Sequence, residues 1–264
     1  MKRIGLIGGM SWESTTEYYR LINREVAHRL GGLHSARIIL SSVDFAEVSA
    51  LQVCGDWDAA GRLLAAEASG LEAAGADLVL ICANTMHKVA DAVEAAVTIP
   101  LLHLADATAN AVRAAGITRV GLLGTAYTME QDFYRDRLAA HGLDVITPEP
   151  ADRAEVHRVI YDELCRGTVL DDSRERYLAI IDRLRDRGAE GVILGCTEIE
   201  LLLDPDAPGP VPLFATTRIH ALAAVDAALA DDLPGFAERG RARATVDRRT
   251  AEEILGYDGD GLPG

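Results

Sequence analysis

The chain contains few aromatic residues and no long apolar segment. Aromatic side chains make up 5% of the 264 residues, against 49% hydrophobic and 25% charged residues. This balance is typical of a soluble globular protein, and the length suits one large domain or two modest ones. No apolar run approaches the roughly 18 residues that a membrane span requires. We therefore expect no association with a membrane.

Basic residues are scarce relative to acidic ones. Lysine and arginine together number 26, against 41 aspartates and glutamates, which gives a formal net charge of −15. An acidic surface repels phosphate backbones, so we expect no nucleic-acid partner. The net charge says little about a small substrate, because nearby groups set the field inside a pocket.

Only four cysteines are present, and their spacing excludes two common uses. They are too few and too scattered for a disulfide framework, and none forms the Cys-x-x-Cys pair of a zinc site. The opening Met-Lys-Arg leads directly into an apolar block that is too short for a signal peptide. We expect a cytoplasmic protein with reduced thiols.

Short aliphatic runs alternate with longer amphipathic segments along the chain. This alternation predicts parallel sheets with helices on both faces, so the expected fold class is α/β. The expected buried strands are 4–8, 37–42, 78–82, 120–124, 144–147, 192–195 and 210–214, and helical spacing is clear in 59–74, 174–187 and 218–229.

Two landmarks of the first half recur in the second half. Residues 3–8 (Arg-Ile-Gly-Leu-Ile-Gly) resemble residues 119–124 (Arg-Val-Gly-Leu-Leu-Gly), at an offset of 116. A glycine leads through aliphatic residues to Cys82, and another leads in the same way to Cys196, at an offset of 114. Matched landmarks at nearly constant offset indicate two similar halves.

The repeat predicts how the chain divides into domains. We expect a first α/β domain from residues 1–105 together with 215–264, and a second from residues 106–214. The last segment returns to the first domain because 218–229 has helical spacing. The tail after Gly256 contains too few apolar residues to pack, so we expect it to be frayed.

Cys82 and Cys196 both end predicted strands, where ligands bind in open parallel sheets. Polar residues follow both cysteines, and backbone N–H groups at the start of a following helix lower the pKa of a thiol. If the two halves face each other, the thiols approach a bound molecule from opposite sides. Inverting a carbon centre needs a base on one face and an acid on the other. The pair therefore favours racemisation.

Cysteine is also a common small residue of hydrophobic cores. That interpretation stands for Cys54 and Cys165, which have no counterpart in the other half. The matched positions of Cys82 and Cys196 favour the catalytic interpretation for this pair alone.

Several motifs extend the argument beyond the cysteines. They are Cys82-Ala83-Asn84-Thr85-Met86-His87, Gly195-Cys196-Thr197-Glu198-Ile199, the opening Gly8-Gly9-Met10-Ser11-Trp12-Glu13-Ser14-Thr15, and shorter matches at Tyr18-Tyr19, Ile22-Asn23, Asp44-Phe45-Ala46, Gln52, Trp57, Gly124-Thr125, Thr128-Met129, Phe133-Tyr134 and Tyr161-Asp162-Glu163-Leu164. Together they resemble the aspartate/glutamate racemase family, in particular its broad-substrate and L-glutamate-preferring branch. The resemblance covers about residues 3–230.

The resemblance implies two pseudo-symmetric Rossmann-like α/β domains with an active-site cleft between them, and a homodimer. It implies racemisation of aspartate, glutamate or a broader range of amino acids without pyridoxal phosphate or metal, with Cys82 and Cys196 as the catalytic pair. The family motifs also supply the residues expected to bind the substrate, which are Met10, Ser11, Gln52, Asn84, Thr85, Thr125, Thr128, Thr197 and Glu198.

Two positions depart from the family pattern. Where the family has Phe-Asp-Thr-Thr, this chain has Ala215 in place of the aspartate. A carboxylate at position 215 is expected to reach the cleft and hold the substrate ammonium; alternatively, residue 215 only caps the next helix. Relatives also often carry a lysine for the substrate's side-chain carboxylate, which is absent here although Arg166 and Arg174 are close.

No cofactor is expected from the remaining motifs. The glycines around Gly8 match neither a dinucleotide fingerprint nor a phosphate-binding loop, and instead suit close approach of a carboxylate. His87 follows Cys82 by one turn and is expected on the helix surface or in a supporting position. His103 and His220 lie in apolar surroundings typical of structural residues. No histidine–carboxylate cluster has metal-ligand spacing.

Two other functions stay open at this point. A related isomerase or decarboxylase would use one cysteine on a small dicarboxylate such as maleate or an arylmalonate, and the second cysteine argues against it. A binding protein would hold an amino acid in the cleft without turnover, which the missing carboxylate at position 215 would permit.

Overall fold

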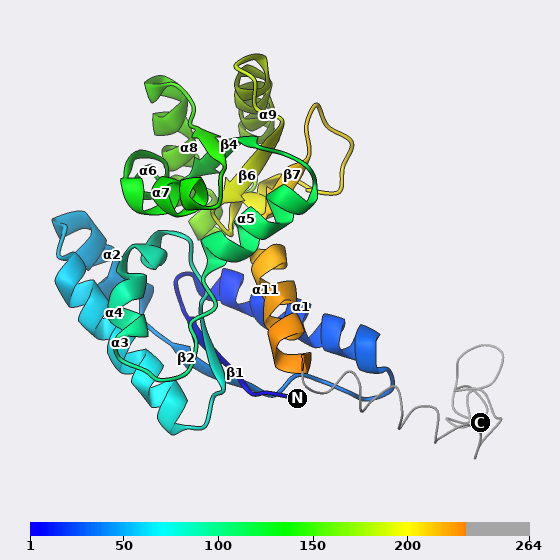
Figure 1. The fold of residues 1–264 in the computed structure, drawn as a ribbon. Coiled ribbons are helices and arrows are strands. Elements are labelled where there is room, and N and C mark those ends of the chain that lie inside the picture. Colours follow the sequence, from blue (N-terminus) through cyan, green and yellow to red (C-terminus); the bar gives the residue numbers. More distant parts are fainter. Residues whose placement is uncertain (231–264) are drawn as a thin grey trace, which may run out of the picture. The chain divides into compact units, whose positions relative to one another are not determined.

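The computed structural model of the protein describes residues 1–230, of which Met1–Ala228 form one compact unit. The expected fraying after Gly256 lies outside the described residues. Within these residues each strand is followed by one or more helices (Figure 1). None of the helices in the described part is long and apolar enough to cross a membrane.

The strands are β1 (Ile4–Gly8), β2 (Ile38–Ser42), β3 (Leu78–Ile81), β4 (Arg119–Gly124), β5 (Asp144–Ile146), β6 (Gly191–Gly195) and β7 (Leu213–Ala215). The helices are α1 (Trp12–Leu30), α2 (Phe45–Cys54), α3 (Trp57–Ala73), η1 (Thr85–Val89), α4 (Ala90–Glu94), α5 (Leu104–Ala114), α6 (Ala126–Glu130), α7 (Asp132–Ala140), α8 (Pro150–Asp162), η2 (Leu164–Arg166), α9 (Asp171–Asp186), α10 (Ile199–Leu202) and α11 (Thr216–Leu229).

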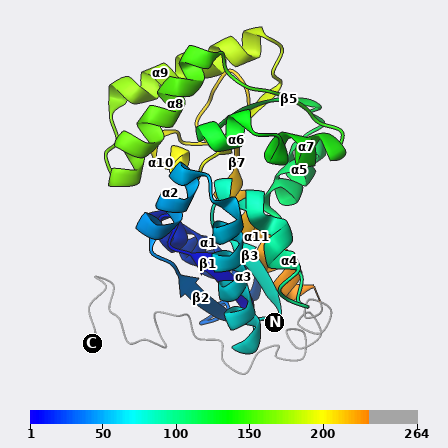
Figure 2. The ribbon, with the colours of Figure 1, turned by 90° about the vertical axis from the view of Figure 1, so that its left-hand side faces the viewer.

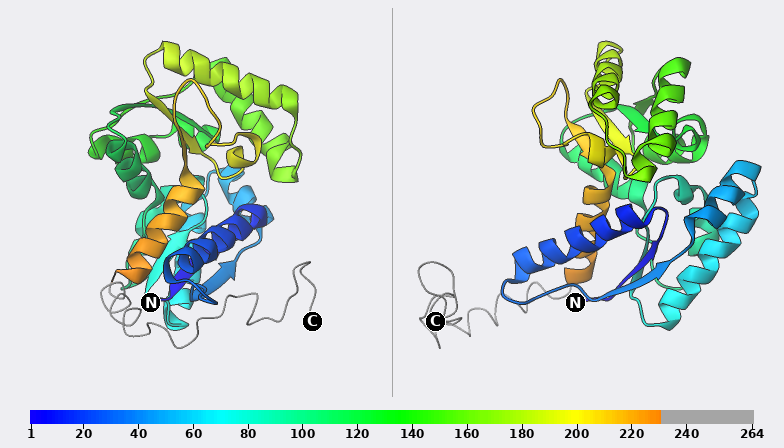
Figure 3. Two further views of the ribbon diagram at one scale, coloured as in Figure 1. Left: turned by 90° about the vertical axis from the view of Figure 1, so that its right-hand side faces the viewer. Right: turned by 180° about the vertical axis from the view of Figure 1, so that it is seen from behind.

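The first sheet has the order β2-β1-β3, and its strands are parallel. The central strand β1 and its neighbour β3 are wholly buried, as their continuous aliphatic sequences require. Helix α3 packs Leu64 and Leu71 against Val79 and Ile81 on one face. Helices α1 and α11 lie side by side away from α3 (Figures 1 and 3). We call this sheet and its helices the first lobe.

The second sheet has the order β5-β4-β6-β7 and is also parallel. One core joins Val156 of α8 and Ile181 of α9 to Leu194 of the sheet. Another core joins α5 and α7 to the opposite face, where Tyr134 and Leu138 are fully buried. Figure 2 shows these helices around the second sheet, which we call the second lobe.

The chain passes from the second sheet to the helices of the first lobe at the end of β7. Helix α11 begins at Thr216 and packs beside α1, where the Tyr18 hydroxyl lies 2.9 Å from His220 Nδ1. Its last turn accepts a hydrogen bond from the Lys2 backbone N–H at the Ala228 carbonyl. The division of the chain into domains at residues 105 and 215 stays a prediction.

The expected α/β class with parallel sheets is confirmed, and every expected strand is present within a few residues. The largest shift concerns the strand expected at 210–214, which forms only at Leu213–Ala215. Pro210 and Pro212 lack the N–H that a sheet ladder needs, and Pro212 contributes only its carbonyl, which accepts from Val192. Helix α3 begins earlier than expected because the Asp56 side chain caps its first turn.

Candidate active site

A cavity of about 30 Å³ lies where the carboxyl ends of β3 and β6 meet. This volume corresponds to roughly one water molecule. Both lobes contribute to its lining, which consists of Met10, Phe45, Gln52, Ala83, Asn84, Thr85, Met86, Thr125, Ile160, Tyr161, Cys165, Gly195, Cys196, Thr197 and Glu198. An amino acid therefore enters only if side chains at this cavity move apart.

Most residues expected at the site line this cavity. The lining includes Met10, Gln52, Asn84, Thr85, Thr125, Cys196, Thr197 and Glu198. The three others lie directly behind it. Ser11 donates to Glu198, Thr128 hydrogen bonds to Thr85, and Cys82 immediately precedes the lining residue Ala83.

Cys196 forms a hydrogen bond to a buried carboxylate. Its Sγ lies 3.0 Å from Glu198 Oε2, which also accepts a hydrogen bond from the Thr197 hydroxyl at 2.6 Å. The Ser11 hydroxyl donates to the other oxygen, Oε1, at 2.7 Å. Burial, and then the Glu198 charge, hold the pKa of the Cys196 thiol well above its usual value. Cys196 is therefore held as a protonated thiol in this arrangement, and the low thiol pKa expected at the end of this strand was wrong.

Cys82 has a different environment. It is fully buried at the end of β3, and burial raises the pKa of its thiol. Within residues 1–230 its sulfur makes no hydrogen bond. Two residues later, Asn84 donates to the Thr216 hydroxyl at 3.0 Å and accepts from the Tyr134 hydroxyl at 3.0 Å. Asn84 is thus fixed in orientation but carries no charge.

Threonine hydroxyls connect the two lobes beside the cavity. Thr85 at the start of η1 lies 2.9 Å from Thr125 Oγ1 and 3.2 Å from Thr128 Oγ1. Thr125 caps α6, so this contact fixes the start of a second-lobe helix against the first lobe. A second bridge joins the Tyr161 hydroxyl to Gln52 Oε1 at 3.3 Å. These hydroxyls can donate to an anionic group such as a carboxylate.

The glycine after β1 brings the backbone close to a neighbouring loop. Gly9 adopts a φ of 91°, and a Cβ there would lie 2.2 Å from the Val43 carbonyl oxygen. Only glycine tolerates both conditions. The turn leads into Ser11, which caps α1 by accepting from the Ser14 N–H at 3.4 Å. The same Ser11 hydroxyl donates to Glu198, so this turn places a first-lobe donor at the second-lobe carboxylate.

His87 supports the strand end from inside the protein, so the surface alternative was wrong. It is 3% exposed, and its Nε2 accepts from the Leu104 N–H at 3.1 Å. The proton is therefore on Nδ1, which donates to the Ala83 carbonyl at 2.8 Å. Burial lowers the pKa of His87 to about 4. His103 and His220 are also buried and contact His87 edge to face.

Of the two cysteines outside the pair, Cys165 packs against the core of the second lobe and Cys54 does not. Cys54 at the end of α2 is exposed, so its assignment to the core was wrong. A cysteine at the end of an amphipathic helix can be buried or exposed, and its packing against other elements decides which. Cys165 is partly buried and lines the cavity together with Tyr161. Burial raises the pKa of the Cys165 thiol to about 12. The sequence indicated Tyr161 through a family motif but gave no sign of Cys165.

The two positions that depart from the family pattern lie outside the cavity. Ala215 ends β7, is 4% exposed and lines neither this cavity nor the larger pocket described below. Arg174 donates to the Leu202 carbonyl and pairs with Asp171. Arg166 is exposed in η2. Neither arginine lines the cavity, so neither replaces the missing lysine in this conformation.

No group of three or more histidine, cysteine, aspartate or glutamate side chains in residues 1–230 could hold a metal ion.

Known proteins resemble this chain in sequence and in fold. A model of the family described as Asp/Glu/Hydantoin racemase matches residues 7–224. The chain is similar to the "putative Asp/Glu Racemase" of Yersinia pestis, with 56% identity and a TM-score of 0.81 over 87% of this chain and 100% of that one. It is also similar to an aspartate racemase homologue from Pyrococcus horikoshii, with 35% identity and a TM-score of 0.75 over 86% and 99% of the two chains.

A more distant structure shares only the fold. The glutamate racemase of Francisella tularensis, solved in complex with D-glutamate, is 17% identical and gives a TM-score of 0.56 over 88% of this chain and 82% of that one. These structures have the same two-domain arrangement of parallel sheets.

Proposed function

Because the chain belongs to the Asp/Glu/hydantoin racemase family, we propose that it racemises aspartate, glutamate or a broader range of amino acids with Cys82 and Cys196 as the two bases. Family membership supports a racemase, and therefore an isomerase. The choice of substrate and the two-cysteine mechanism are the proposal. The observation that carries it is the hydrogen bond from the Cys196 thiol to Glu198 in a cavity where the strand end bearing Cys82 also arrives.

The proposed reaction moves one proton off the Cα atom and another onto it. One cysteine, as a thiolate, removes the α-proton from one face of the substrate. The other, as a thiol, delivers its proton to the opposite face. The first cysteine then carries a proton and the second is a thiolate, so the protein is ready for the opposite enantiomer. In one direction the Cys196 thiol is the acid, and its hydrogen bond to Glu198 keeps the sulfur protonated before the transfer.

Burial raises the pKa of both thiols, so a thiolate needs compensation. We infer that the substrate ammonium supplies it when it enters the cavity, since an opposite charge favours the ionised thiol. The substrate carboxylate is expected to accept hydrogen bonds from hydroxyls that line the cavity, such as those of Thr85, Thr125 and Thr197. No pyridoxal phosphate, nicotinamide or metal has a role in this scheme.

Incubation with single L-amino acids in deuterated water tests the proposal. A racemase incorporates deuterium at Cα and forms the D-enantiomer, which mass spectrometry and chiral chromatography detect. Consumption of maleate or an arylmalonate without exchange of any amino acid would instead show a dicarboxylate enzyme. Binding of an amino acid without exchange would show a sensor.

The proposal includes a cytoplasmic homodimer. Light scattering of the purified protein measures its oligomeric state, and a monomer at working concentration would contradict this part.

A further inference from the structure

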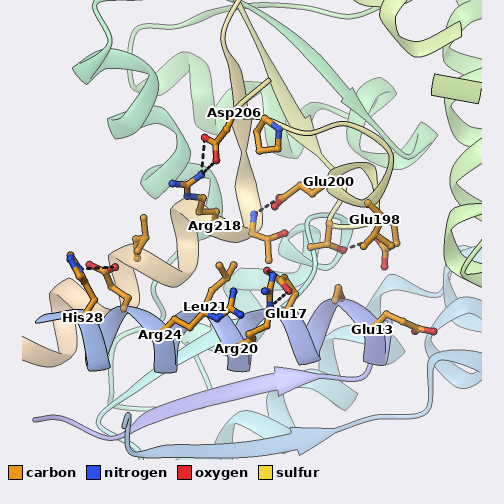
Figure 4. Close-up of a pocket in the computed structure, with 17 residues that line it drawn as sticks. Glu13, Glu17, Arg20, Leu21, Arg24, His28, Glu198, Glu200, Asp206 and Arg218 are labelled. Carbon is orange, nitrogen blue, oxygen red and sulfur yellow. Dashed lines mark hydrogen bonds and ion pairs between the residues drawn. The ribbon is translucent and has the colours of Figure 1, made fainter. Parts of the chain in front are cut away.

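A second and larger pocket lies on the other side of Glu198. It has a volume of about 550 Å³, in the range of small-molecule sites. Helix α1 forms one side, and the segment from Thr197 through α10 to the start of α11 forms the other (Figure 4). Thr197 and Glu198 line both this pocket and the cysteine cavity, but neither cysteine of the pair lines the larger pocket.

The inner end of this pocket contains a buried hydroxyl and a half-buried carboxylate. Thr217 is 1% exposed and lines the pocket, and its Oγ1 has no hydrogen-bond partner among the described residues. A buried hydroxyl without a partner costs free energy, which a ligand can recover. Beside it, Glu200 Oε1 accepts from the Thr217 N–H at 2.9 Å. Burial raises the pKa of Glu200 to about 7, so a cation beside it would restore its charge.

Most charges at the mouth of the pocket neutralise one another. Arg20 pairs with Glu17 through two hydrogen bonds, and Arg218 pairs with Asp206. Arg24 is exposed and makes no hydrogen bond or ion pair within residues 1–230. Among the described residues, the pocket therefore offers Glu200 to bind a cation and the unpaired Arg24 to bind an anion.

The spacing of these two groups limits the ligand. Glu17 lies close enough to Glu200 for its charge to raise the Glu200 pKa. Arg24 lies seven residues after Glu17, about 10 Å further along the helix axis. Helical side chains tilt toward the N-terminus, which shortens the gap that a ligand has to span. Figure 4 shows Glu200 across the pocket from the helix that carries Arg24.

We propose that this pocket binds a small zwitterion whose ammonium and carboxylate are separated by a chain of several atoms. The ammonium pairs with Glu200 and donates to the Thr217 hydroxyl, while the carboxylate pairs with Arg24. Two natural sources have this chemistry, a basic amino acid such as lysine and a short peptide. The site is separate from the proposed racemisation and does not depend on it.

Calorimetric titration with 6-aminohexanoate tests the site. This probe has no amino group next to its carboxylate, so it is not a substrate for inversion at Cα. We expect saturable binding to the full-length protein, weakened about tenfold by Glu200→Gln and by Arg24→Gln, since each removes one charged hydrogen bond. Gln can still accept from the Thr217 N–H, and thermal unfolding checks that the variants fold.

The controls separate the site from general charge effects. Glu94→Gln and Arg113→Gln change exposed charges on other helices and should leave the affinity unchanged. Hexylamine and hexanoate each carry one charge and should bind at least about tenfold more weakly than the zwitterion. L-lysine and glycylglycine then distinguish the two sources by their relative affinity. The proposal fails if 6-aminohexanoate does not saturate, if both pocket variants bind it normally, or if either single-charge probe binds as tightly.

Discussion

Asn84 and Glu198 occupy equivalent places in the two halves, yet only one of them is charged. Each follows a cysteine by two residues at the end of a strand that pairs with the first strand of its sheet. Glu198 accepts a hydrogen bond from the Cys196 thiol, whereas Asn84 bonds to Tyr134 and Thr216. The two cysteines are therefore related by the repeat, but only Cys196 has a carboxylate as its neighbour at this position.

The substitution Glu198→Gln should lower the pKa of the Cys196 thiol. The carboxylate raises that pKa by its charge and by accepting the thiol hydrogen bond, so a neutral amide lets the thiol ionise at lower pH. We expect the Cys196 thiolate to form at lower pH than in the parent protein, measured by its ultraviolet absorbance in a background where Cys54, Cys82 and Cys165 are replaced by serine. Glu94→Gln, on an exposed helix position, is the control. An unchanged titration would mean that the hydrogen bond does not control this thiol.

Replacing either cysteine of the pair by serine should abolish racemisation and leave the fold intact. A hydroxyl is far less acidic than a thiol, so it cannot serve as the base near neutral pH. The loss should be about 10²–10⁴-fold or more in kcat, measured by chiral chromatography with circular dichroism as the folding check. Cys54→Ser is the control because this residue is exposed and outside the cavity. Full activity of Cys82→Ser or Cys196→Ser would refute the two-base mechanism.

Cys165→Ser should affect substrate binding. Cys165 lines the same cavity as Cys196, so we expect this variant to alter KM while kcat changes less than in the variants of the pair.

The three buried histidines should make stability fall steeply in mild acid. Burial lowers the pKa of His87 to about 4, of His220 to about 3 and of His103 to about 2. In the unfolded chain they titrate near pH 6.5, so below about that pH the unfolded state binds more protons. Their contribution is complete above about pH 6.5 and decreases by up to about 1.4 kcal/mol per pH unit for each histidine as the pH falls toward 4.

Glu200 acts in the opposite direction. Its pKa is raised to about 7, so its contribution is complete in acid and is lost as the pH rises toward 7. One carboxyl opposes three histidines, so the free energy of unfolding should still increase with pH between about pH 4.5 and 6.5. Glu200→Gln should make this increase steeper. Urea unfolding at a series of pH values measures it for the parent protein and for the variant, and a free energy that does not change with pH would show that the histidines are not held neutral.

The substitution Ala215→Asp tests the two roles considered for this position. Ala215 directly precedes α11 and lines neither cavity. A carboxylate there can cap the helix and stabilise the protein by about 1 kcal/mol. We therefore expect a melting temperature higher by about 2–4 °C and unchanged kcat/KM for aspartate and glutamate. A tenfold gain in kcat/KM with no change in melting temperature would support the sequence-based alternative that position 215 reaches the substrate.

The sequence was sufficient to predict the positions of the strands, because strands buried on both faces need continuous aliphatic runs and these are easy to recognise. It also located both cysteines of the pair, since each ends such a run. It failed where placement depends on packing between distant segments. The exposure of Cys54, the position of Cys165 at the cavity and the bonding of His87 to Leu104 all depend on how helices settle against each other. The larger pocket that Thr197 and Glu198 share with the cysteine cavity could not be predicted, because its lining comes from segments about 180 residues apart.

The small volume of the cysteine cavity has a consequence for reaction with alkylating agents. Iodoacetamide needs an accessible thiolate, and both cysteines of the pair are buried while the cavity has room for only about one water. In a Cys54→Ser background, the rate of inactivation therefore reports how often the two lobes separate. A bound amino acid that holds the lobes together should slow this inactivation, and the reagent then measures closure without any turnover.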